Sequence, residues 1–126
     1  MPNIAHFSDQ FREVIHGSNY ELSRKGYASG QVELIEAARE NMAALCKKDT
    51  YDSPTKVLNY VECHDNQTLW DKNLICCFQE SEKIRKKRQI LTNAMVLLAQ
   101  GIPFIHAGQE FGRTKRGIGN SYNKPD

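Results

Sequence analysis

The chain has 126 residues, a length typical of one domain or of part of one. Hydrophobic residues make up 40% of it and charged residues 25%, as in an ordinary soluble globular protein. The net charge of +2 gives no reason to expect nucleic acid or an anionic membrane as a partner, and the apolar runs are too short to span a bilayer.

The four cysteines are Cys46, Cys63, Cys76 and Cys77. They show no Cys-x-x-Cys spacing, which argues against a zinc knuckle or a thioredoxin-like site, and neighbouring cysteines rarely bond each other. Scattered thiols and the lack of a secretory signal at the start both favour a reducing cytoplasm, although a longer parent protein could be secreted.

The first half of the chain predicts a short strand, a loop and a helix. Residues 4–7 lean apolar and are a candidate strand, and residues 8–30 are polar and rich in glycine and serine, so they predict a loop with at most one helical turn. Residues 31–47 repeat apolar side chains at steps of three and four, which indicates an amphipathic helix with Ser29 as its N-cap.

The second half predicts two further strands around a long helix. Residues 57–61 are β-branched and aromatic, as in a strand that is buried on both faces, and residues 63–80 are irregular or mixed. Residues 82–100 predict a helix capped by Ser81, and residues 102–107 predict the third strand.

The helix predicted over 82–100 carries an apolar stripe and a basic start. Ile84, Leu91, Met95 and Leu98 fall on one helical stripe and are the expected buried face. The basic run at residues 83–88 is best explained as a solvated outer face, so we expect no nucleic-acid site there.

The order strand, helix, strand, helix, strand predicts parallel strands with helical crossovers. The long connections, at residues 8–30 and 63–81, both leave the carboxyl ends of strands. In parallel α/β folds this edge of the sheet holds the active site.

The densest cluster of reactive side chains lies at residues 62–66, directly after the second predicted strand. There His64 and Asp65 would point into a cleft at the sheet edge. A carboxylate in this place could stabilise positive charge, bind a metal or hold a sugar hydroxyl. The same residues could also simply form a turn.

At this point the sequence resembles a known family. Residues 60–66 read Tyr-Val-Glu-Cys-His-Asp-Asn, and together with residues 68–72 they resemble the fourth conserved region of the α-amylase clan of glycoside hydrolases in its pullulanase form. Further segments resemble type I pullulanases in the same order along the chain, namely residues 1–17, 98–110, 113–115 and 120–123.

The resemblance implies an α/β fold in which residues 1–126 form the C-terminal part of a catalytic (β/α)₈ TIM barrel, an incomplete barrel of roughly strands six to eight with their helices. It implies retaining hydrolysis of α-1,6-glucosidic bonds in an α-glucan of the pullulan, starch or glycogen type. It implies no cofactor, and the implied protein partners are the missing half of the barrel or a second copy of the chain.

The resemblance also assigns roles to residues. Asp65 matches the carboxylate that stabilises the oxocarbenium-like transition state, and His64 matches a hydrogen-bond donor to the same sugar ring. The substrate-binding residues that we expect are His64, Asn66, Trp70, Tyr122 and Asp126, and we expect no metal ligands. Trp70 could equally be a packed anchor of its loop, and Asn66 a loop former.

Retaining hydrolysis needs a nucleophilic carboxylate and a separate acid/base about 5–5.5 Å apart. The family motifs that carry these two residues do not occur in the 126 residues, so we expect the chain alone to be inactive. We also expect weak stability, because the sheet edge would be exposed and half of the barrel is missing. The alternative function is a non-catalytic αβ module that binds glucan or associates with other chains. A nucleotide-binding unit is disfavoured because no glycine-rich phosphate loop follows any predicted strand.

Overall fold

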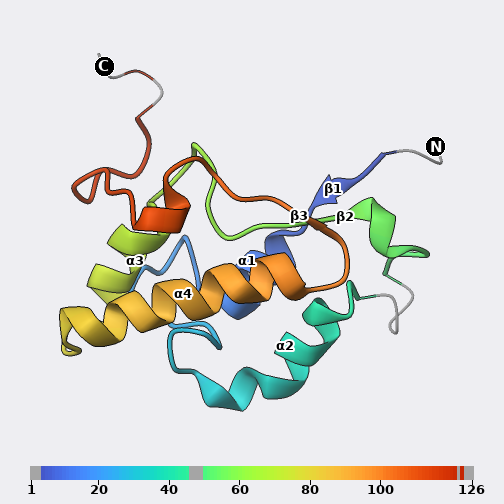
Figure 1. Cartoon of the computed structure of the whole chain (residues 1–126), viewed down its shortest axis with the longest axis horizontal. Helices are drawn as coiled ribbons and strands as arrows, with labels where there is room; N and C mark the ends of the chain where they lie inside the picture. The colour runs from blue at the N-terminus through green and yellow to red at the C-terminus, as the bar shows by residue number, and fades with distance from the viewer. Residues whose placement is uncertain (1–3, 46–49, 122, 124–126) are drawn as a thin grey trace.

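The structure is a computed structural model that describes residues 4–45, 50–121 and 123 (Figure 1). The described part contains three strands, β1 (His6–Phe7), β2 (Val57–Asn59) and β3 (Ile102–Pro103). It contains four α-helices, α1 (Asp9–Ile15), α2 (Ile35–Met42), α3 (Leu69–Cys76) and α4 (Glu82–Leu98). Single 3₁₀ turns are η1 (Val32–Leu34), η3 (Pro54–Lys56) and η4 (Gln109–Phe111).

The three strands form one parallel sheet with β2 in the centre. His6 pairs with Val57 on one side of the sheet, and Leu58 pairs with Ile102 on the other. The prediction of parallel strands joined by helices is therefore confirmed. The carboxyl ends of all three strands lie at one edge of the sheet.

The prediction of an incomplete (β/α)₈ barrel is wrong. The sheet consists of parallel strands of two, three and two residues, accompanied by four helices in the part of the chain that is described. A barrel wall needs strands long enough to stack several layers of inward side chains, and these strands offer one layer at most. The chain is a small three-stranded fragment that is not recognisable as part of a barrel.

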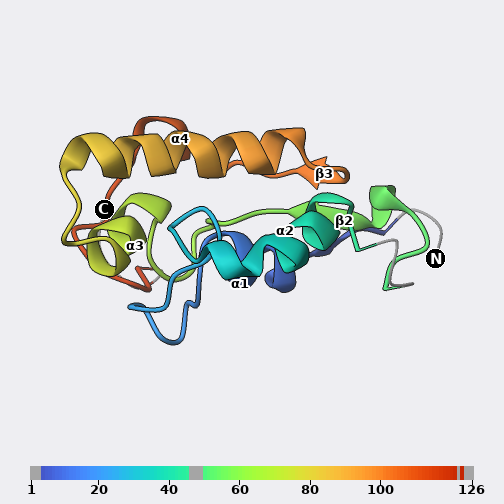
Figure 2. The ribbon, with the colours of Figure 1, turned by 90° about the horizontal axis from the view of Figure 1, so that it is seen from below.

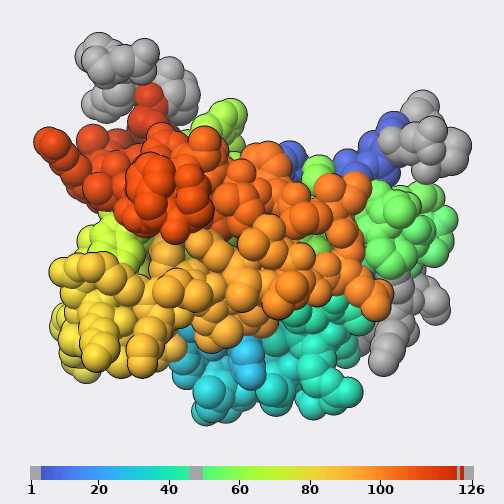
Figure 3. Space-filling model, viewed as in Figure 1, coloured from blue at the N-terminus to red at the C-terminus, as the bar shows by residue number. Residues whose placement is uncertain are grey.

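The helices lie on both sides of the strands. Figure 2 shows α4 along one side of the molecule and α1 and α2 along the other, and Figure 3 shows α4 crossing one face. The central hydrophobic cluster consists of Phe11, Ile15, Ala28, Ala38, Val61, Leu69, Val96 and Ala99. No helix within the described residues is long and apolar enough to cross a membrane.

Helix α1 occupies part of the segment that was predicted to be a loop. The Ser8 hydroxyl accepts a hydrogen bond from the Phe11 backbone N–H at 3.1 Å, which is an N-cap. Phe11 and Ile15 lie one turn apart and are fully buried. The loop was predicted because residues 17–30 are rich in glycine and serine, but α1 ends before this stretch begins.

Helix α2 is shorter than predicted and begins later. The Ser29 side chain does not cap it, because the hydroxyl accepts a hydrogen bond from the Gly26 backbone N–H at 2.8 Å. The helix ends at Met42, and both Ala44 and Leu45 have left-handed backbone angles that stop it. The last two predicted residues of this helix lie outside the described residues.

Helix α4 begins as predicted but buries a different face. The Ser81 hydroxyl accepts from the Ile84 backbone N–H at 3.4 Å, which confirms the predicted cap. The predicted apolar stripe is largely exposed, whereas Gln89, Thr92 and Val96 are buried. The polar members of this face have partners inside the protein, since Gln89 donates to the carbonyl of Gln109 at 2.8 Å.

Candidate functional site

A cavity of about 380 Å³ lies at the carboxyl ends of the three strands. Phe7 ends β1, Tyr60 follows β2 directly, and Phe104 follows β3 directly. The residues that line the cavity are Phe7, Tyr60, Cys63, His64, Asp65, Phe104 and His106. The structure thus brings His64 and Asp65 to the sheet edge where the sequence placed them.

Aromatic rings form one wall of this cavity. The Phe7 ring meets the Tyr60 ring edge-on at 4.8 Å between centroids, and the Phe104 ring edge-on at 5.2 Å. Such edge-to-face pairs are favourable because the positive edge of one ring meets the negative face of the other. The cavity therefore has an apolar wall that suits the C–H face of a sugar ring.

The Tyr60 hydroxyl is held in place from α1. It accepts a hydrogen bond from the Arg12 guanidinium at 2.5 Å and donates one to the Asp9 carboxylate. Burial raises the pKa of Tyr60, and the hydrogen bond to Asp9 raises it further. The phenol is therefore neutral at physiological pH and orients the aromatic wall without supplying charge.

The two residues with candidate chemistry are exposed. Nε2 of His64 lies 3.3 Å from the Asp65 carboxylate, and their side chains are 84% and 56% exposed. A carboxylate that remains hydrated can interact with a positive centre that enters the cavity. The arrangement offers a negative charge beside a hydrogen-bonding imidazole.

Below this pair lies a buried carboxylate, Glu62. One of its oxygens accepts from the Leu69 backbone N–H at 2.8 Å, at the start of α3. The other accepts from Nδ1 of His106 at 2.9 Å, on the segment after β3. The side chain is fully shielded from solvent, so Glu62 ties the exits of β2 and β3 to α3 and cannot contact a ligand.

A lysine from the C-terminal segment fixes the loop that carries the exposed pair. Nζ of Lys115 donates to the carbonyl oxygens of His64 at 2.5 Å, Asn66 at 3.0 Å and Gly119 at 3.1 Å. Burial lowers the pKa of Lys115, and the nearby Arg113 lowers it further. The bonds to His64 and Asn66 hold the backbone of the loop, and the bond to Gly119 holds the segment of Lys115 itself.

Asp71, a buried residue of α3, holds the segment that supplies Lys115. Its carboxylate accepts from the Thr114 hydroxyl at 2.5 Å and from the backbone N–H groups of Lys115 at 2.7 Å and Gly117 at 3.3 Å. The position of the loop after β2 therefore depends on α3: Asp71 holds the backbone of Lys115, and the Lys115 side chain holds the loop.

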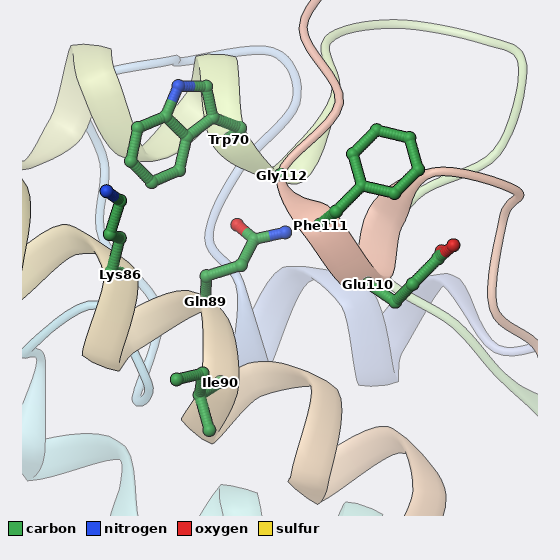
Figure 4. Close-up of a pocket in the computed structure, with 7 residues that line it drawn as sticks. All are labelled: Trp70, Lys86, Gln89, Ile90, Glu110, Phe111 and Gly112. Atoms are coloured by element: carbon green, nitrogen blue, oxygen red, sulfur yellow. The ribbon is translucent and has the colours of Figure 1, made fainter.

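Trp70 lies in a separate pocket of about 380 Å³ between α3, α4 and η4 (Figure 4). The pocket is lined by Trp70, Lys86, Gln89, Ile90, Glu110, Phe111 and Gly112. Gly112 packs against the Trp70 indole, where an added Cβ would meet the ring at 3.5 Å. The structure therefore does not bring Trp70 together with Asp65, and it favours Trp70 as an anchor for η4.

Of the remaining predicted site residues, only Asn66 is described, and it does not line the cavity. Asn66 has a left-handed backbone (φ 59°), and its N–H donates to the Asn120 side chain at 3.0 Å, which fits a loop former. Tyr122 and Asp126 lie outside the described residues. Among the residues that are described, no group of three or more His, Cys, Asp or Glu side chains could hold a metal ion.

Sequence reasoning missed the aromatic wall and the buried supports. Phe7 and Phe104 each lie within a predicted strand, so their meeting at the sheet edge could have been inferred from parallel pairing. His106, which binds Glu62, and Lys115, which binds Asp71, come from segments far along the chain, and no local spacing indicates them.

Comparison with known sequences finds homologues along the whole chain. It is 42% identical to a pullulanase of Bacillus subtilis over 100% of its own length and 18% of that protein. It is 33% identical to pullulanase A of Streptococcus pneumoniae over 97% of its length and 10% of that protein. No family model matches the chain.

Solved structures give the same result. A pullulanase of an Anoxybacillus species in complex with maltotetraose matches with a TM-score of 0.93 and 49% identity, over 98% of this chain and 18% of that one. A type I pullulanase of Bacillus subtilis in complex with maltose matches with a TM-score of 0.91 and 42% identity, over 97% and 18% of the two chains. This chain spans less than a fifth of these relatives. Its homologues are pullulanases, and the whole chain aligns with one segment of them.

Proposed function

We propose that this chain is a segment of a type I pullulanase, a retaining hydrolase of α-1,6-glucosidic bonds, and that it supplies part of the α-glucan site. Asp65 is the carboxylate that stabilises the positively charged transition state, and His64 donates a hydrogen bond to the same sugar ring. The observation that carries the proposal is that His64 and Asp65 line an aromatic-walled cavity at the carboxyl ends of three parallel strands.

The cavity suits a sugar for two physical reasons. The rings of Phe7, Tyr60 and Phe104 can take up the C–H groups of a glucose ring. His64 and Asp65 are free to exchange water for sugar hydroxyls, because both side chains are largely exposed. Solved relatives of this chain bind maltotetraose and maltose, which are linear α-glucans.

We also propose that the chain alone does not cleave glucan. Within the described residues, Asp65 is the one carboxylate that lines the cavity. Glu62 cannot be the second, since its side chain is fully buried and both oxygens are engaged. A retaining glycosidase needs two carboxyl groups about 5–5.5 Å apart, with separate roles.

The experiment is a titration of the purified chain with maltotetraose, followed by amide chemical shifts in NMR. We expect shifts at the residues that line the cavity, and a clear loss of affinity in Asp65→Asn. The matched control is Asp52→Asn, which makes the same chemical change at an exposed residue before the amino end of β2. We expect this control to bind as the wild type does.

Two results would contradict the proposal. Shifts that gather around Trp70 and η4, with none near Asp65, would place the sugar in the other pocket. Release of reducing sugar from pullulan by the wild-type chain, abolished by Asp65→Asn, would show that the chain is itself an active enzyme.

A further inference from the structure

Two cysteines at the end of α3 form a vicinal dithiol that the proposed glucan site does not use. Cys76 is the last residue of the helix, and Cys77 follows it as the C-cap. Their sulfur atoms lie 3.6 Å apart, and both thiols are free. The residues are 6% and 1% exposed, so surrounding protein holds both sulfurs in place.

A third cavity is lined in part by these two cysteines. It has a volume of about 270 Å³ and is lined by Lys25, Cys76, Cys77, Phe78, Gln79 and Glu80. Phe78 is 71% exposed, so the rim of the cavity lies at the surface, on the side from which a small reagent would approach the two cysteines. The Cys77 sulfur lies 3.5 Å from the backbone carbonyl oxygen of Ser29, on which its position also depends.

The electrostatics favour a reactive thiolate at Cys76. The hydrogen bond with Cys77 lowers the pKa of Cys76, and the charge of the buried Lys72 lowers it as well. Cys77, the donor, has a raised pKa for the same reason. The thiolate is the nucleophile in thiol chemistry, so the lowered pKa makes Cys76 the sulfur that attacks first.

We propose that Cys76 and Cys77 form a site for trivalent arsenicals and similar thiophilic reagents that take two sulfurs at once. The reaction with phenylarsine oxide forms two As–S bonds and breaks the As=O bond. The oxygen leaves as water, with one proton from each thiol or, when Cys76 is already a thiolate, with the proton of Cys77 and one from solvent, and no atom changes oxidation state. The product is a ring in which arsenic bridges the two side chains.

The geometry favours this bridge over a disulfide. A disulfide requires an S–S length of about 2.03–2.05 Å, and residues that are neighbours in sequence reach that geometry with difficulty. An arsenic bridge leaves the two sulfurs unbonded to each other, near the separation they already have. The pair is therefore arranged for chelation. We expect it to react with the arsenical faster than air oxidises it to a disulfide.

The experiment uses the full chain with Cys46→Ser and Cys63→Ser as background, which leaves one pair of thiols. Phenylarsine oxide is added to the folded protein, and intact mass and free thiols are measured with excess mercaptoethanol as a competing monothiol. We expect one phenylarsenic adduct with loss of one water and of both thiols, and reversal by dithiothreitol. Each single variant, Cys76→Ser and Cys77→Ser, should hold arsenic roughly 10²-fold less tightly, because the second sulfur acts at high effective concentration.

Circular dichroism checks that each variant remains folded, and the thiol count in the background chain tests the site even if a single variant unfolds. An adduct that survives equally well in Cys77→Ser would overturn the proposal. So would a folded background chain that takes up no arsenic while the same chain in urea does.

Discussion

The base and the tip of the loop after β2 differ sharply in their surroundings. At the base, the Glu62 carboxylate is fully buried and bonded to Leu69 at the start of α3 and to the distant His106 after β3. At the tip, His64 and Asp65 are exposed and contact each other at 3.3 Å. The comparison teaches that the buried polar groups provide the stability and position of the loop, while the exposed pair is left to meet a ligand.

The largest effect should come from the base. Glu62→Ala leaves the N–H of Leu69 and the ring of His106 without their acceptor, and we expect a loss of about 3–5 kcal/mol in the free energy of unfolding. Urea denaturation measures it. The control is Glu36→Ala, which removes an exposed carboxylate paired with Arg39 and should cost less than about 1 kcal/mol. Equal costs for the two variants would mean that Glu62 is not the anchor.

A second buried polar group, His16, extends the comparison to pH. Its ring is fully buried, and neither ring nitrogen has a hydrogen-bond partner among the described residues. Burial lowers its pKa from 6.5 to about 3, and the charges of Lys72 and Arg12 add to the shift. Between these two values the unfolded chain binds the proton more readily than the folded one, so stability is full above pH 6.5 and falls as the pH drops toward 3.

The measurement compares urea midpoints of the wild type and His16→Phe at pH 7 and pH 4.5. His16 alone should destabilise the wild type by about 2–3 kcal/mol at the lower pH, at 1.36 kcal/mol for each pH unit. The variant lacks the titrating ring, so its loss of stability between pH 7 and pH 4.5 should be smaller than that of the wild type by this amount. Parallel losses in the two proteins would show that His16 does not resist protonation in the folded state.

A smaller effect is expected at Asp71, which supports the loop indirectly. Asp71→Asn replaces one acceptor oxygen with a donor that faces the backbone N–H groups of Lys115 and Gly117. We expect a cost of about 1–2 kcal/mol and faster hydrogen exchange at these two amides. Asp52→Asn, on an exposed side chain, is the control. An unchanged rate of hydrogen exchange at the Lys115 amide would show that Asp71 does not support the segment that holds the loop.

The smallest change in stability should come from the tip. Asp65→Asn alters an exposed side chain and should change the free energy of unfolding by less than about 0.5 kcal/mol. Its effect on maltotetraose binding should nevertheless exceed that of Asp52→Asn. A loss of stability as large as that of Asp71→Asn would remove the distinction between base and tip.

The sequence predicted those features that depend on local pattern. The parallel order of the strands, the cap at Ser81 and the position of Asp65 at the sheet edge all follow from short segments. The buried face of α4 could not be predicted in this way, because Gln89 and Thr92 are polar. Each is buried with a carbonyl acceptor, which for Gln89 is the distant Gln109 and for Thr92 is Arg88 in the same helix.

The barrel was inferred from a resemblance and not from the strands themselves, and the structure has only short strands in their place. Pairs such as Asp71 with Lys115, or Tyr60 with Arg12, join segments that no periodicity connects. Such contacts are decided by how the helices pack, so a single sequence does not reveal them.

The aromatic wall has a consequence for how the cavity comes into being. Each strand contributes one ring at its carboxyl end, and Phe7 contacts the rings of both other strands. Because synthesis runs from β1 toward β3, Phe104 is made after both Phe7 and Tyr60. The aromatic wall is therefore incomplete until β3 joins the sheet, whatever the length of the chain around it.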